Sequence, residues 1–137
     1  MVAKNGFTLS GSGGAATLAF VGSGQILFSS DRPSAVPVTS VSLTGLRIDS
    51  TGLDFRAPEP IRLLNCVGCR VTASYFGPRP NRSTAVLIFN GGGTVNVSGN
   101  KFLDGYLQIN SLGGTANSGF PVARNSFDSS GILVITS

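Results

Sequence analysis

The side chains that could carry out acid–base chemistry in this sequence are few. There is no histidine, which removes Ser–His and Cys–His nucleophile chemistry and the usual imidazole metal ligands. A hydrolase or lyase would have to work with six carboxylates: Asp31, Asp49, Asp54, Glu59, Asp104 and Asp128. Glycosidase carboxylates lie roughly 5–9 Å apart. The fold must therefore bring two of these acids together before such chemistry is available.

Cys66 and Cys69 form the one CxxC motif, CVGC. A structural zinc needs four ligands, and the chain has no further Cys or His, so a closed zinc site within one chain is excluded. A redox CxxC belongs at a helix start near a βαβ unit, which this sequence does not predict. We expect Cys69 to be buried and inert and Cys66 to lie on a turn, and a disulfide between them remains open. No cofactor is expected.

The glycines Gly91–Gly93 could be mistaken for a phosphate-binding loop. No Lys-Ser or Lys-Thr follows them, and no helix is predicted that would supply a dipole. They are interpreted as a turn.

The net charge of +4 is not gathered into Lys/Arg runs, so nucleic-acid binding is not expected. Arginines beside prolines recur in three loops, and stacking would place them on one edge as a basic ridge of Arg32, Arg56, Arg79 and Arg82. Two interpretations stay open. The loops are rigid and solvated, or the ridge contacts an acidic protein or an anionic polysaccharide.

The elements that position these residues are predicted to be short strands. The chain has 19 glycines and 7 prolines, which favour turns, and no window sustains a 3.6-residue period. No apolar run is long enough to span a membrane, and the N-terminus lacks the apolar core of a signal peptide.

A repeat of about 23 residues organises the strands. Thr or Asn closes an apolar strand at spacings of 21, 25, 20 and 26 residues, at Thr44, Asn65, Asn90, Asn110 and Thr136. Apolar pairs five residues apart keep the same period, at Ile48–Leu53, Val71–Phe76, Val97–Phe102 and Val122–Phe127, with Thr51, Ser74, Asn100 and Asn125 inside them. One copy cannot bury its own apolar face, so the copies must stack. Residues 1–14 are expected to be a flexible or capping segment before a repeat domain over residues 15–137.

Stacking brings one acid pair close. Asp104 and Asp128 fall one residue out of register on neighbouring repeats, whose strands lie about 4.8 Å apart. The simpler explanation is that both acids bond turn backbone, so they are only the alternative candidates for a catalytic pair.

The V-x-V-S-G-N-x-F form at Val95–Phe102, its echo at Val122–Phe127 and the Asn anchors resemble the right-handed parallel β-helix, the fold of pectate lyases and many bacteriophage tailspikes. The resemblance implies an all-β, single-stranded right-handed parallel β-helix (β-solenoid) of about five coils. It also implies a stacked turn ladder of Asn65, Asn90 and Asn110. Asn suits such turns because it tolerates the left-handed conformation and bonds backbone locally.

Two functions of different class are compatible with this fold. The favoured one is a non-catalytic structural or attachment module at a virion surface, such as a capsid decoration, fibre or tailspike segment, and otherwise extracellular. The alternative is a polysaccharide lyase or glycosidase. The few acids, the missing histidine and the small number of coils favour the structural module.

Self-association is expected through an outward apolar stripe. If Val41, Leu43 and Leu107 point inward, the alternate residues of later repeats face outward: Ile61, Leu63, Val86, Ile88, Tyr106, Ile132 and Val134. A monomer rarely exposes so large an apolar patch, so a homotrimer is predicted. The last strand, Gly131–Thr136, has no cap and is expected to dock on another copy, another structural protein or a downstream part of the chain.

Overall fold

The computed structural model describes residues 4–12, 16–28, 38–57, 59–64, 66–78, 84–90, 95–111, 122–128 and 131–136. Every regular element in these ranges is a β-strand, and every strand pair is parallel. The all-β prediction is therefore confirmed. None of the described residues forms a helix that could cross a membrane.

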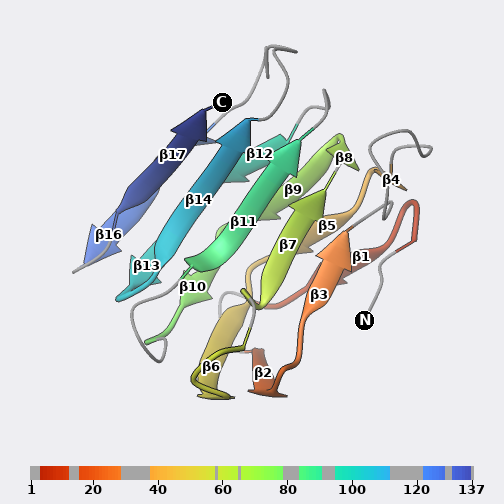
Figure 1. Ribbon diagram of the computed structural model, residues 1–137. Helices are drawn as coiled ribbons and strands as arrows, with labels where there is room; N and C mark the ends of the chain where they lie inside the picture. Colours follow the sequence, from red (N-terminus) through yellow and green to blue (C-terminus); the bar gives the residue numbers. More distant parts are fainter. Residues whose placement is uncertain are drawn as a thin grey trace.

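The strands form three five-stranded sheets (Figure 1). The first contains β1 (Thr8–Ser10), β5 (Ser42–Thr44), β9 (Cys69–Thr72), β12 (Val95–Ser98) and β15 (Val122–Ala123). The second contains β2 (Thr17–Gly22), β6 (Arg47–Leu53), β10 (Tyr75–Phe76), β13 (Lys101–Leu103) and β16 (Ser126–Asp128). The third contains β3 (Ile26–Phe28), β7 (Ile61–Leu64), β11 (Thr84–Asn90), β14 (Tyr106–Ser111) and β17 (Ile132–Thr136).

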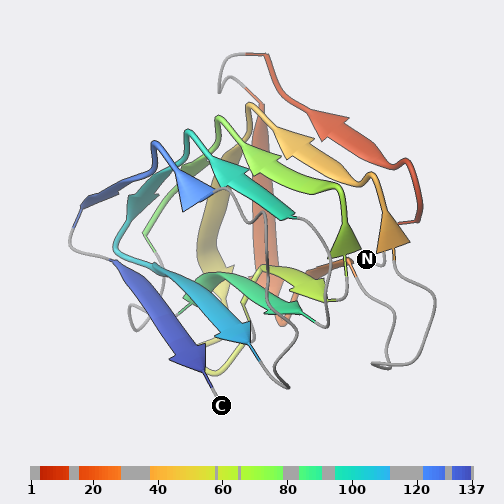
Figure 2. The same cartoon turned by 90° about the horizontal axis from the view of Figure 1, so that it is seen from above.

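The chain visits the first, second and third sheets in that order and then begins again, so each visit is one repeat. A two-stranded sheet of β4 (Val38–Thr39) and β8 (Cys66–Val67) precedes the first-sheet strands of the second and third repeats. Figure 2 shows the first and third sheets on opposite sides and the second sheet joining them at one side. Strands from successive repeats are therefore neighbours in every sheet.

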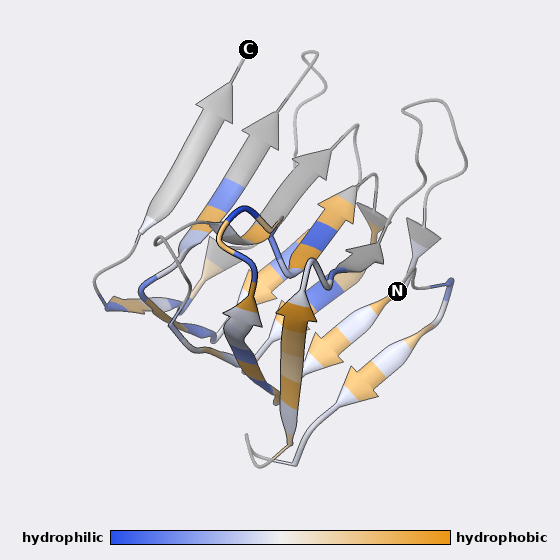
Figure 3. Ribbon diagram, turned by 60° about the horizontal axis from the view of Figure 1, so that its bottom comes forward, coloured by the Kyte–Doolittle hydropathy of each residue, from blue (hydrophilic) through white to orange (hydrophobic). Residues whose placement is uncertain are grey.

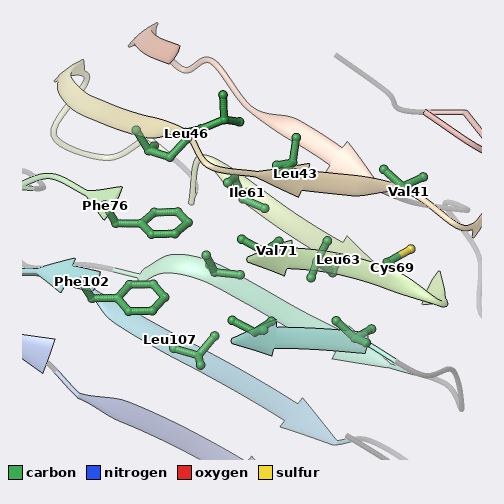
Figure 4. Packing of buried hydrophobic residues seen from close by; sticks show 14 of the residues in the cluster. Val41, Leu43, Leu46, Ile61, Leu63, Cys69, Val71, Phe76, Phe102 and Leu107 are labelled. Atoms are coloured by element: carbon green, nitrogen blue, oxygen red, sulfur yellow. The ribbon is translucent and has the colours of Figure 1, made fainter. Parts of the chain in front are cut away.

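Alternating hydrophobicity decides which side chains enter the core. In β12, Val95 and Val97 are buried while Asn96 and Ser98 are half-buried, as expected for a strand with one face toward the interior. The same alternation is visible as bands along the first-sheet strands in Figure 3. Apolar side chains from all three sheets meet in one core, shown in Figure 4.

The predicted register is correct for the later repeats. Val71 pairs with Val97 and Val97 with Val122, and Phe102 pairs with Phe76 and Phe127. In the second repeat the partners are Leu43 and Ile48 instead of Ile48 and Leu53. Ile48 and Leu53 are both buried, so apolarity alone did not distinguish the two alignments.

The stacked strands begin earlier than residue 15. Within residues 1–14, predicted to be flexible or capping, Thr8–Ser10 form β1 and pair with β5. Phe7 and Leu9 pack against the core. This segment therefore contributes to the first repeat.

Candidate functional site

The corner between the first and second sheets repeats one backbone conformation. Gly45, Ala73, Gly99 and Arg124 follow the first-sheet strands and all have positive φ, between 50° and 67°. This left-handed conformation is easy for glycine and costs energy for Ala73 and Arg124. It turns the chain sharply from one sheet to the next. The N–H groups of Gly45, Ala73 and Gly99 donate to carbonyls of the following repeat, those of Thr72, Ser98 and Ala123, at 3.0–3.1 Å.

The residue after each positive-φ position forms a second set of bonds, which we call the corner ladder: Leu46, Ser74, Asn100 and Asn125. The Leu46 N–H donates to Ser74 Oγ at 3.2 Å, the Ser74 N–H to Asn100 Oδ1 at 3.0 Å, and the Asn100 N–H to Asn125 Oδ1 at 3.0 Å. Asn100 Nδ2 donates to the Val71 carbonyl and Asn125 Nδ2 to the Val97 carbonyl. Each repeat is thereby bonded to the next.

The predicted ladder of Asn65, Asn90 and Asn110 is wrong for the last two residues. Asn90 pairs with Ser111, and Asn110 pairs with Phe89, so the two asparagines are one residue out of register. Asn65 lies outside the described residues. The signal for the corner ladder was present in the sequence, because Ser74, Asn100 and Asn125 recur between the paired Val and Phe positions.

Phenyl rings stack beside the corner ladder. The Phe76 and Phe102 ring centroids lie 4.7 Å apart, the Phe102 and Phe127 centroids lie 5.1 Å apart, and both pairs have an interplanar angle of 9°. Phe76 and Phe102 are fully buried, whereas Phe127 in the last repeat is half-buried. The core is therefore closed in the middle repeats and partly open at the last one.

The predicted apolar interface is wrong where the structure tests it. Ile61, Leu63 and Val86 are 0%, 1% and 0% exposed and belong to the core. Tyr106 is exposed at 37%. The side chains of Ile88, Ile132 and Val134 lie outside the described part of the molecule. Their backbones pair with Leu63, Leu107 and Ile109 respectively.

The cause is the same one-residue slip. Val86 pairs with both Ile61 and the buried Leu107, after an irregularity between Thr84 and Val86. Aligning Asn90 with Asn110 reversed the faces of β7 and β11, because a shift of one residue exchanges the two faces of a strand. Arg62, which did not fit the predicted inward face, instead forms an ion pair with Glu59.

The acid pair proposed from sequence does lie on neighbouring strands. Leu103 pairs with Asp128, and the Asp104 N–H donates to the Asp128 carbonyl at 2.9 Å. Asp104 has a φ of 64° and is half-buried, while Asp128 is exposed. The backbone contact fits the turn-bonding explanation. The proximity of the two residues also keeps them the alternative candidates for carboxylate chemistry.

Asp49 is the carboxylate with a perturbed pKa. Its Oδ1 accepts hydrogen bonds from the Thr51 hydroxyl at 2.7 Å and the Thr51 N–H at 2.9 Å. These bonds and the nearby Arg47 charge lower the pKa of Asp49 below its ordinary value of 3.8, against a smaller opposing effect of desolvation. Both bonds favour the ionised form, so Asp49 has a local structural role.

Cys69 is a fully buried thiol on β9, opposite Val41 and Val95, as the sequence predicted. Cys66 lies in β8 and pairs with Val38 through its backbone. Within the described ranges, no group of three or more His, Cys, Asp or Glu side chains could hold a metal. Gly91–Gly93 lie outside the described residues.

The basic ridge can be examined only at Arg56, which is exposed. Arg32, Arg79 and Arg82 lie outside the described residues. A different basic row crosses the second sheet, where Tyr75 lies between Arg47 and Lys101 on adjacent strands. Both cations are exposed, and Arg47 Cζ lies 4.7 Å from the Tyr75 ring centroid.

Comparison of the chain with protein families, curated proteins and solved structures found no match.

Proposed function

We propose that the chain is a right-handed parallel β-helix that serves as a non-catalytic structural or attachment module. The β-helix proposal is supported by the constant order in which the chain visits three parallel sheets. It is supported also by the bonds of the corner ladder between successive repeats. A fold of this kind presents long, regular surfaces.

One observation carries the attachment role. Strands β15, β16 and β17 are the terminal strands of all three sheets, and all belong to the last repeat. Within the described residues, each has a neighbour on one edge only. Such edges offer unpaired N–H and C=O groups to another strand. Since the predicted stripe is largely buried, this end replaces it as the surface through which the chain attaches.

The setting we propose for such a module is a virion surface, in a decoration, fibre or tailspike segment, or another extracellular assembly. Its partner is another structural protein at the end formed by β15, β16 and β17. The exposed Arg47 and Lys101 give a second surface with the charge to attract an acidic polysaccharide.

The alternative is a carbohydrate-active enzyme, favoured by the contact between Asp104 and Asp128. Incubation with acidic and neutral polysaccharides distinguishes the two functions. We expect no new reducing ends or unsaturated products. Turnover that is lost in Asp104→Asn or Asp128→Asn, but kept in a variant of the exposed Asp54, would establish the enzyme instead.

A further inference from the structure

The corner of the last repeat has two backbone donors whose equivalents are bonded in earlier repeats. In the second to fourth repeats, the N–H of the positive-φ residue donates to a carbonyl of the next repeat. The N–H that follows donates to a side-chain oxygen of the next repeat. The corresponding N–H groups of Arg124 and Asn125 have no acceptor among the described residues. Two adjacent donors therefore await a carbonyl and a side-chain oxygen.

The core is unfinished at the same place. Phe102 is 0% exposed between Phe76 and Phe127. Phe127 is half-buried and stacks on Phe102 alone among the described rings. Another apolar ring or chain on the far side of Phe127 would bury area worth about 25 cal/mol per Å².

We propose that the edge formed by β15 and β16 binds, by strand addition, a polypeptide that follows the pattern V-x-x-N-x-F or V-x-x-S-x-F. This inference rests on the proposed attachment function and names the partner of that surface. The Asn or Ser of the partner accepts from the Asn125 N–H, and the carbonyl two residues earlier accepts from the Arg124 N–H. The Phe of the partner stacks on Phe127. Parallel strand addition supplies the remaining backbone bonds.

A second copy of this chain, stacked head to tail, does not satisfy the same donors. Its opposite end presents β1 and β2, and Thr17 pairs with Arg47, so Ala16 occupies the position of the corner ladder. Alanine has no side-chain acceptor, and the Ala16 carbonyl already accepts from the Arg47 N–H. The partner is therefore a different polypeptide with an acceptor at this position.

The test uses the full chain and a nine-residue peptide with the sequence of residues 95–103, VNVSGNKFL. Titration followed by amide NMR is expected to be saturable, and hydrogen exchange at the Arg124 and Asn125 amides is expected to slow at saturation. A peptide with Leu in place of its Asn, as Leu46 stands in the second repeat, should bind at least about five-fold more weakly, the factor for one lost hydrogen bond. A peptide of shuffled sequence should not bind.

Variants of the chain locate the site. Phe127→Asp should abolish binding, while Phe55→Asp, which changes another exposed ring, should leave it unchanged. Circular dichroism establishes that each variant is folded, and the peptide series on the wild-type chain decides the question if Phe127→Asp is not. Three results would overturn the proposal: no saturable binding, equal binding of the Asn and Leu peptides, or a self-association that protects Arg124 and Asn125. Failure of the proposed function would appear separately, as polysaccharide turnover.

Discussion

Asn100 shows how much depends on a single side chain in this fold. It is 2% exposed, accepts a bond from the Ser74 N–H and donates to the Val71 carbonyl and to Asn125 Oδ1. A hydrophobic replacement would leave the Ser74 N–H and the Val71 carbonyl without these partners. Buried groups that lose their partners cost far more than the net value of a hydrogen bond.

Asn100→Leu is therefore expected to lower the free energy of unfolding by about 2–4 kcal/mol, at about 1–3 kcal/mol for each buried group left unsatisfied. Asn5→Ala is the matched control, because Asn5 is exposed and its Oδ1 accepts one bond, from the Thr39 N–H. That variant should lose less than about 1 kcal/mol. Urea unfolding measures both, and equal losses would contradict the importance of the corner ladder.

Asp49 predicts a pH dependence of stability. Because its pKa is lowered in the folded chain, its contribution is fully present above the unfolded value and is lost as the pH falls through the folded value. Asp49→Asn should lower the melting temperature slightly at pH 7, and the difference from wild type should vanish by about pH 2. The exposed Asp54→Asn is the control. A larger difference at low pH than at pH 7 would have the wrong sign.

At the scale of elements, the stacked rings join neighbouring strands of the second sheet. Phe102→Ala should cost about 3–5 kcal/mol, because it removes a fully buried ring from the middle of the stack. Phe127→Ala should cost roughly half as much, since less of that ring is removed from water. Chemical unfolding of the two variants measures the difference. Equal costs would mean that the last repeat is as closed as the middle ones.

The orientation of the third-sheet strands predicts opposite outcomes for two substitutions. Val86→Asp places a charge in the core and should prevent folding, at a cost of several kcal/mol. Tyr106→Asp changes a side chain on the exposed face and should cost less than about 1 kcal/mol. Soluble yield and circular dichroism distinguish them. A folded Val86→Asp protein beside an unfolded Tyr106→Asp protein would restore the predicted outward stripe.

The strands, their parallel stacking and the Val and Phe register could be predicted from sequence, because those positions alternate clearly between apolar and polar residues. The third sheet could not, because β7 and β11 carry apolar residues at successive positions, as in IRLL and TAVLIFN. A period of two then fixes neither face. Arg62 was the informative exception, since an arginine at a predicted core position argues for the opposite face.

The acids and the corner ladder show a different limit. The spacing of Asp104 and Asp128 in the sequence was enough to place them on neighbouring repeats, as the structure confirms. The corner ladder depends on which residue follows a positive-φ turn, and Ala73 and Arg124 hold that conformation without being glycine. Their residue types do not announce the turn, so the acceptors at Ser74 and Asn125 were seen as a period but not as a bonded ladder.

At the scale of the whole molecule, the account holds that each repeat is closed by the next and that the last repeat is left open. Residue-resolved amide hydrogen exchange on the isolated chain tests this most directly. The N–H groups of Ser74 and Asn100 should be strongly protected, because the next repeat accepts from them. Those of Arg124 and Asn125, at the same two positions of the last repeat, should exchange orders of magnitude faster. Equal protection at all four amides would contradict the open end.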